Sequence, residues 1–133
     1  MELAVRMAER SVGLTTPNPP VGVIITKDGK ILSRGWTQPG GSPHAEIHAI
    51  NQVSNKSSLE GSTMYSTLEP CSHRGKNPPC IDNIIKYKFK YVIISQKDKN
   101  PLVNGDGIKR LRSKGIKVIQ ISFSNYINRF NNI

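Results

Sequence analysis

The chain of 133 residues has no apolar run near the roughly 20 residues that a helix needs to cross a bilayer. Its N-terminus also lacks the basic stretch followed by an apolar segment that marks a secretory signal. These absences predict a cytoplasmic protein with no membrane association. The length suits a single domain over residues 1–133, which can bury roughly two thirds of its unfolded surface in a core.

Cysteine is scarce, because the chain has only Cys71 and Cys80, both within residues 70–80. A disulfide is possible, but a reducing compartment and a His-x-Glu sequence upstream favour metal ligation. His44 and the two thiolates would make three protein ligands, the number typical of catalytic zinc sites that keep a fourth position for water. Glu46 could then move protons to and from that water without binding the metal.

Acidic residues are also few, with nine Asp and Glu against nineteen Lys and Arg and a net charge of +10. Nucleic acid, an acidic membrane surface or an anionic small substrate would each suit this charge. The lysines are scattered, however, and form no compact block of like charges, so a solvated basic surface explains them equally well. Aromatic residues make up only 6% of the chain and offer few stacking partners for nucleic acid.

The spacing of apolar residues and turn signals predicts alternating strands and helices. The expected strands are 21–26, 30–36, 62–68, 91–95 and 116–121, and the expected helices are 2–11, 44–53, 80–88 and 108–113. Asp28-Gly29 between the first two strands is a strong hairpin signal. A hairpin followed by β-α-β units predicts a three-layer α/β/α fold, with helices on both faces of a mixed sheet of about five strands.

Prolines place the candidate ligands at helix starts. Pro43 is expected as the first helical residue before His44, and Pro78-Pro79 precede Cys80. Side chains two residues apart diverge inside a helix, but in a first turn His44 and Glu46 can converge beyond the helix end. The positive end of the helix dipole is expected to lower the pKa of the Cys80 thiol and favour its thiolate.

The His-x-Glu and Pro-Cys elements match those of zinc deaminases, except that eight residues rather than two separate the cysteines. This longer segment closely resembles the deaminase domain of the riboflavin-biosynthesis enzyme diaminohydroxyphosphoribosylaminopyrimidine deaminase. The other matching motifs are Thr16–Gly22, Gly40–Glu46, Thr67–Glu69 and Lys97–Pro101. The resemblance covers nearly the whole chain, with the motifs in the same order and spacing.

The resemblance implies a cytidine deaminase-like fold and hydrolysis of the 2-amino group of 2,5-diamino-6-(5-phosphoribosylamino)pyrimidin-4-one. It implies one zinc ion per chain and proton transfer by Glu46. The metal ligands implied are His44, Cys71 and Cys80, and the substrate ligands implied are Asn18, His73 and Lys76, with Asp98 and Asn100 as further candidates. His73 and Lys76 are expected near the ribose phosphate.

Simpler interpretations stay open for several of these residues. Lys76 would also suit an ordinary exposed surface, and Asn18, between prolines, could merely shape a turn. His73 could compete as a metal ligand. His48 is expected to be a packed or surface histidine, because the glutamate is misplaced for a His-Glu-x-x-His motif. Thr37 stands where many relatives carry a histidine, so a substrate contact is expected to be altered or absent there.

Relatives are commonly bifunctional, with a reductase domain that would begin about where this chain stops at Ile133. We therefore expect no reductase domain here, and either a separate reductase or a truncated chain. A homo-oligomer is expected, and nucleic acid is a disfavoured partner. The alternative functions are another zinc deaminase, acting on deoxycytidylate, guanine or a tRNA adenosine, and a non-catalytic zinc module that binds nucleic acid.

Overall fold

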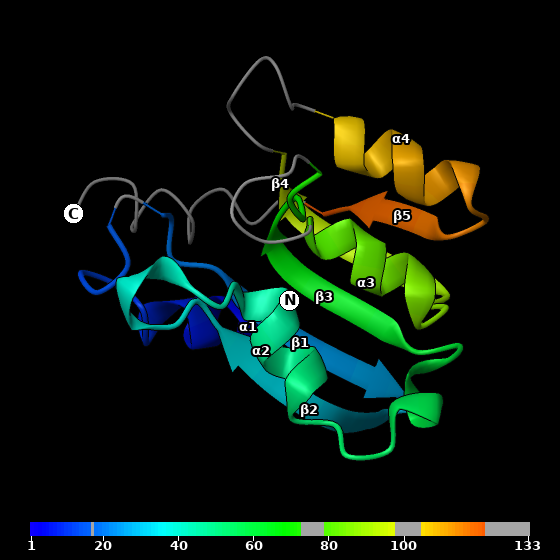
Figure 1. Cartoon of the computed structure of the whole chain (residues 1–133), viewed down its shortest axis with the longest axis horizontal. Coiled ribbons are helices and arrows are strands. Elements are labelled where there is room, and N and C mark those ends of the chain that lie inside the picture. The colour runs from blue at the N-terminus through cyan, green and yellow to red at the C-terminus, as the bar shows by residue number, and fades with distance from the viewer. Residues whose placement is uncertain (17, 73–78, 98–104, 122–133) are drawn as a thin grey trace.

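A computed structural model describes residues 1–16, 18–72, 79–97 and 105–121. Its single sheet has the strand order β2-β1-β3-β4-β5 (Figure 1). The strands are β1 (Gly22–Lys27), β2 (Lys30–Trp36), β3 (Thr63–Leu68), β4 (Tyr91–Gln96) and β5 (Lys117–Gln120). β1 is antiparallel to both β2 and β3, whereas β3, β4 and β5 are mutually parallel. The predicted mixed sheet is confirmed.

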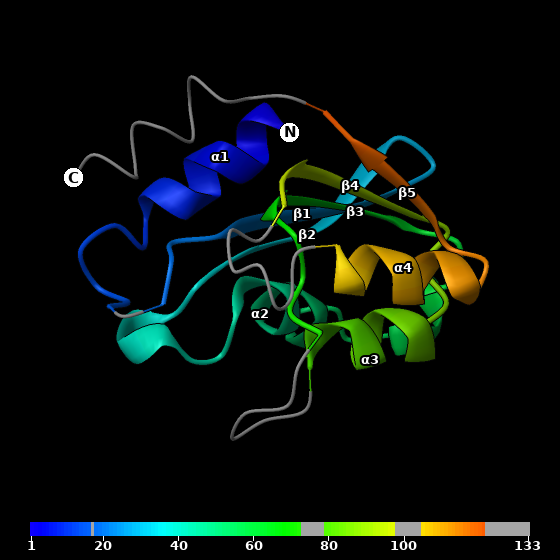
Figure 2. The same cartoon turned by 90° about the horizontal axis from the view of Figure 1, so that it is seen from above.

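Helices cover both faces of this sheet, as predicted. α1 (Glu2–Glu9) lies on one face, and α2 (Ala45–Asn51), α3 (Cys80–Lys86) and α4 (Asp106–Ser113) lie on the other (Figure 2). Two short 3-10 helices, η1 (Pro39–Gly41) and η2 (Lys56–Leu59), were not predicted. Among the residues described, no helix has the length and apolar character needed to span a membrane.

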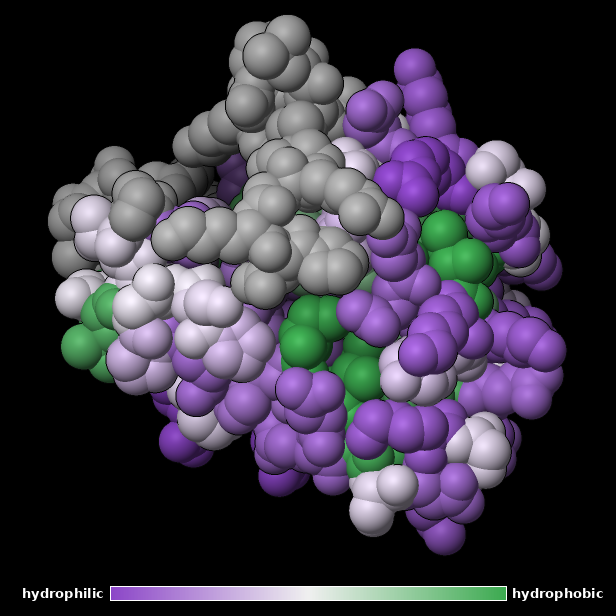
Figure 3. All heavy atoms as spheres, viewed as in Figure 1, coloured by the Kyte–Doolittle hydropathy of each residue, from purple (hydrophilic) through white to green (hydrophobic). Residues whose placement is uncertain are grey.

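The core follows the alternation of side chains along the strands. Val23 and Ile25 of β1 point into the larger apolar cluster beneath α2, α3 and α4, while Ile24 between them points to Ala4 and Met7 of α1. Figure 3 shows one face of the molecule, where apolar side chains form small separate areas among hydrophilic ones.

Glycines let two helices approach the sheet closely. A Cβ added to Gly22 would lie 2.5 Å from the backbone nitrogen of Ala8 in α1. A Cβ added to Gly35 of β2 would lie 2.7 Å from the Cβ of Ala49 in α2. Real atoms do not approach so closely, so a side chain at either position would push the helix away. Gly35 therefore sets how close α2, which follows His44, sits to the sheet.

We expect Gly35→Ala to lower the free energy of unfolding by about 1–3 kcal/mol, because the added methyl group overpacks the contact between β2 and α2. Urea denaturation at fixed zinc concentration would measure this loss. Arg34→Ala is the matched control on the same strand, since Arg34 is exposed and its loss should change stability by less than about 0.5 kcal/mol. Equal stability of both variants would contradict this account of the packing.

Candidate metal centre

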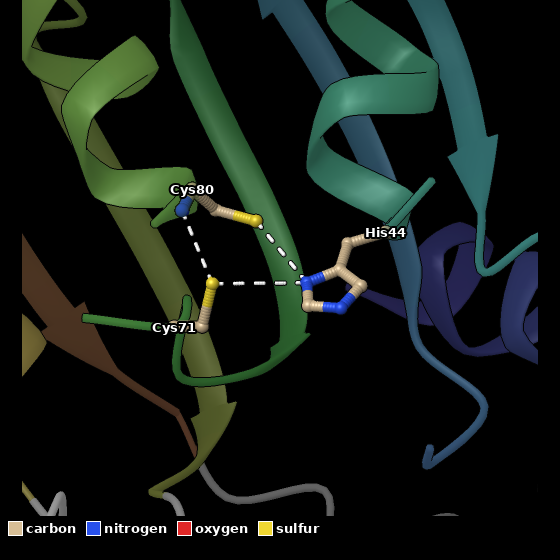
Figure 4. A group of neighbouring side chains, drawn as sticks. All are labelled: His44, Cys71 and Cys80. Carbon is tan, nitrogen blue, oxygen red and sulfur yellow. Dashed lines mark hydrogen bonds between the residues drawn. The ribbon is translucent and has the colours of Figure 1, made fainter. Parts of the chain in front are cut away.

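Three elements bring the predicted ligands together (Figure 4). His44 is the N-cap of α2, Cys71 follows β3 by three residues, and Cys80 is the first residue of α3. The Nδ1 atom of His44 lies 3.7 Å from the Sγ atom of Cys71 and 3.4 Å from that of Cys80. The three ligand atoms all lie within 4.8 Å of one another. One imidazole nitrogen and two thiol sulfurs so arranged suit a zinc ion.

The start of α2 differs from the prediction. Pro43 lies two residues before the helix, and His44 keeps an extended backbone with φ −65° and ψ 160°. The carbonyl oxygen of His44 still accepts the hydrogen bond from the backbone N–H of His48, which is the first bond of the helix. Because His44 is half outside the helix, its side chain reaches the cysteines while Glu46 stays in the first turn.

The two thiols share a hydrogen bond. This hydrogen bond with Cys80 lowers the pKa of the Cys71 thiol to about 4, and the backbone N–H of Cys80 also donates to the Cys71 sulfur at 3.1 Å. The same thiol pairing, helped by burial, raises the pKa of Cys80. The expectation of a lowered pKa at Cys80 is therefore wrong, because Cys71 receives both hydrogen bonds. The hydrogen bond with Cys71 raises the pKa of His44.

Glu46 is almost fully buried, with 4% of its surface exposed. Burial raises the pKa of its carboxyl, and a hydrogen bond with Cys80 opposes that effect. A raised pKa lets a carboxyl group hold a proton closer to neutral pH, which a group that both accepts and donates protons requires. The carboxyl thus borders the ligand cluster, and its pKa is shifted in the direction that an acid–base group requires.

Asn18 lies in the segment between α1 and β1. Its Nδ2 donates to the carbonyl oxygen of Gly41 at 3.0 Å, three residues before His44. Its backbone also forms a turn with Thr15, whose carbonyl accepts from Asn18 N at 2.7 Å. Asn18 therefore both shapes a turn and forms a hydrogen bond to the segment that precedes His44. Thr37 is buried with 2% exposure, and its hydroxyl bonds to backbone groups.

Four of the predicted substrate ligands lie outside the described residues, namely His73, Lys76, Asp98 and Asn100. They stay predictions. His48 is a packed histidine, as expected. Its Nδ1 accepts from the backbone N–H of Trp36 at 3.2 Å, and its ring meets the Trp36 ring edge-on with centroids 4.7 Å apart.

The contacts between α4 and the cysteine segments were not predicted from the sequence. Glu69 is 4% exposed, and its carboxylate accepts from the backbone N–H groups of Gly105 at 3.0 Å and Gly107 at 3.1 Å. Arg110 of α4 donates to the carbonyl oxygen of Ser72 at 3.2 Å and to Asp82 at 3.1 Å. Its place in a matching motif, two residues before Cys71, was a sequence signal for a role of Glu69 near the site. Nothing in the sequence indicated that Gly105 and Gly107 would be its hydrogen-bond partners.

The comparisons with known proteins agree with this geometry. A family model described as the cytidine and deoxycytidylate deaminase zinc-binding region matches residues 1–96. The chain is 48% identical over 118 residues to a diaminohydroxyphosphoribosylamino-pyrimidine deaminase of Buchnera aphidicola subsp. Schizaphis graminum, covering 89% of this chain and 79% of that protein.

Longer relatives match over a part of their length. Riboflavin biosynthesis protein RibD of Aquifex aeolicus is 45% identical over 118 residues, which are 89% of this chain and 33% of the relative. The solved structure of Acinetobacter baumannii RibD, form 2, superposes with a TM-score of 0.92 and 37% identity, over 98% of this chain and 36% of that one. The chain thus spans about a third of the length of these relatives.

Proposed function

The chain belongs to the diaminohydroxyphosphoribosylaminopyrimidine deaminase family of zinc deaminases, and from this we propose its reaction. It hydrolyses the 2-amino group of 2,5-diamino-6-(5-phosphoribosylamino)pyrimidin-4-one in riboflavin biosynthesis. The products are 5-amino-6-(5-phosphoribosylamino)uracil and ammonia. The observation that carries the proposal is the 48% identity to a deaminase of which the chain covers 79%.

One zinc ion per chain would be held by His44, Cys71 and Cys80. The closeness of one imidazole nitrogen and two sulfurs, all within 4.8 Å, supports this assignment. Zinc at a site with three protein ligands supplies Lewis acidity and lowers the pKa of a water molecule toward neutrality. The lowered pKa of Cys71 favours metal binding, because the thiolate is the form that ligates.

Glu46 carries the protons in this proposal. It accepts a proton from the attacking water while the water oxygen bonds to C2, and it passes that proton to a ring nitrogen of the pyrimidine. The carboxylate then takes the remaining proton of the C2 hydroxyl and delivers it to the amine. The carbon–nitrogen bond breaks, the C2 carbonyl forms, and ammonia leaves. The burial of Glu46 and its raised pKa support both roles, because the group must hold a proton between two transfers.

Recognition of the substrate is assigned to five further residues. Asn18 hydrogen-bonds the pyrimidine, while His73 and Lys76 bind near the ribose phosphate, and Asp98 and Asn100 are further contacts. Lys76 suits a phosphate because its ammonium is a compact cation.

We expect Lys76→Ala to raise the KM for the phosphorylated substrate by roughly 10- to 100-fold, because a charge-assisted contact is lost, with little change in zinc content. The KM is measured from the steady-state rate of ammonia release. Lys30→Ala is the matched control, since Lys30 is an exposed lysine at the start of β2 and its KM should stay at the wild-type value. If the dephosphorylated substrate were processed as well as the phosphorylated one, the role of Lys76 would be refuted.

Ammonia release from a panel of substrates tests the function. The purified, zinc-loaded chain should act on the phosphorylated ribosylaminopyrimidine and leave deoxycytidylate, guanine and tRNA unchanged. Preference for one of those three would replace the riboflavin-pathway assignment with another zinc deaminase. Zinc binding without any ammonia release would favour the non-catalytic module.

The proposed setting is the cytoplasm. The proposed next partner is a reductase that acts on the product and is carried by a separate chain. A homo-oligomer is proposed for the assembled enzyme.

A further inference from the structure

The turn that carries Asn18 is closed by hydrogen bonds to its own backbone. The N–H of Asn18 donates to the carbonyl oxygen of Thr15 at 2.7 Å, and the Thr15 hydroxyl donates back to the carbonyl oxygen of Asn18 at 2.7 Å. Thr15 is 2% exposed. The backbone of Asn18 is therefore fixed by Thr15, which lies in the segment between α1 and β1.

The amide orientation of Asn18 follows from its partner. The carbonyl oxygen of Gly41 can only accept, so the Asn18 amide must turn its nitrogen toward it. Gly41 has φ +87°, and a Cβ there would lie 2.5 Å from that nitrogen, so glycine is needed for this contact. In the ranges that the structure describes, no group donates to the Asn18 oxygen. The Asn18 side chain therefore offers a hydrogen-bond acceptor.

Thr37 fixes the segment that follows this turn. Pro20 has no N–H, and the Thr37 hydroxyl bridges the groups on either side of it, donating to the carbonyl oxygen of Pro19 at 3.2 Å and accepting from the N–H of Val21 at 3.0 Å. The backbone N–H of Thr37 also donates to the carbonyl oxygen of Val21 at 3.0 Å. The buried Ser11 hydroxyl donates to the Thr37 carbonyl at 2.6 Å.

The hydroxyl and the backbone N–H of Thr37 thus hold the segment that follows Asn18, and its carbonyl oxygen holds Ser11, which precedes Asn18. We propose that Thr37 is a positioning residue, which fixes the Asn18 turn so that the Asn18 oxygen accepts from an N–H of the pyrimidine. The inference rests on the proposed function, because the pyrimidine is its ligand. It gives position 37 a role through Asn18 rather than through direct contact with the substrate.

Substitutions at position 37 separate this role from a general loss of stability. Thr37→Val keeps the shape and removes both hydroxyl bonds, so KM should rise about tenfold at unchanged zinc content, while Thr37→Ser should stay within about twofold of the wild type. In an Asn18→Ala background, Thr37→Val should change KM by less than about twofold, since the residue it positions is absent.

Ser33→Ala is the matched control. The Ser33 hydroxyl is another buried donor on β2, bonded to the Ala49 carbonyl at 2.9 Å, and its loss should lower stability without changing KM. If Thr37→Val does not fold, Thr37→Ala removes the same hydroxyl without adding a buried methyl group. It is then compared with and without Asn18→Ala in the same way. An unchanged KM in the variants that lack the hydroxyl, Thr37→Val and Thr37→Ala, overturns the proposal. An equal increase in KM with and without the Asn18 side chain also overturns it.

A second readout does not depend on turnover. Hydrogen exchange of the Asn18 side-chain amide, followed by NMR, should become at least about tenfold faster in Thr37→Val, because the bond to Gly41 loosens. If the wild type releases no ammonia from the pyrimidine and this exchange still accelerates, the proposed function fails and the positioning role stands. If ammonia is released and neither KM nor exchange changes, only the positioning role fails.

Discussion

Glu46→Gln is expected to keep zinc and fold while turnover falls by at least about 10²- to 10⁴-fold, the contribution of general acid–base groups. Glutamine has the shape of glutamate but cannot accept the proton of the attacking water. Because Glu46 is buried and serves both proton transfers in the proposed mechanism, no exposed group can replace it easily. Ammonia release at saturating substrate measures the loss.

The control for this variant is Glu60→Gln. Glu60 is an exposed carboxylate whose ion pair with Lys88 has an N–O distance of 4.0 Å, so its neutralisation should leave turnover unchanged. Zinc content must be measured in both variants. A Glu46→Gln enzyme with full zinc and near-normal turnover would remove Glu46 from the mechanism.

Cys71→Ser and Cys80→Ser are each expected to lose most of the bound zinc and to unfold at lower temperature. Serine has nearly the same size, but its hydroxyl does not ionise near neutral pH and is a poor zinc ligand beside the remaining imidazole and thiolate. Elemental analysis gives the zinc content, and calorimetry gives the shift in Tm. Removing zinc from the wild type with a chelator should lower Tm in the same way.

Ser72→Ala is the neighbouring control, since Ser72 adjoins Cys71 and its contact with Arg110 uses the backbone carbonyl, which the substitution keeps. It should retain zinc. Full zinc occupancy in both cysteine variants would refute the ligand set.

Local signals in the sequence predicted most of the fold. Asp28-Gly29 gives a two-residue hairpin in which both residues have positive φ, 51° and 76°, and Lys27 pairs with Lys30 across it. The end of the first strand, the start of the second and their antiparallel pairing follow from that turn. The parallel strands followed from the helices between them, because a crossover returns the chain in the same direction.

Contacts between distant segments could not be predicted in the same way. In the sequence Gly35 is an ordinary strand residue, and only the fold shows that α2 packs against it. Glu69 is part of a motif in the sequence, and only the fold shows that it accepts hydrogen bonds from Gly105 and Gly107 at the start of α4. The same holds for the hydrogen bond between the cysteines. Only the three-dimensional arrangement shows that the backbone N–H of Cys80 donates to the Cys71 sulfur.

Reconstitution with zinc tests whether the chain is a zinc-dependent deaminase. The chain is stripped of metal, titrated with zinc, and assayed for ammonia release from 2,5-diamino-6-(5-phosphoribosylamino)pyrimidin-4-one at each point. We expect no ammonia release without zinc and a linear rise in release that ends at one zinc ion per chain. Full ammonia release by the metal-free chain, or none from the zinc-loaded chain, would contradict this expectation.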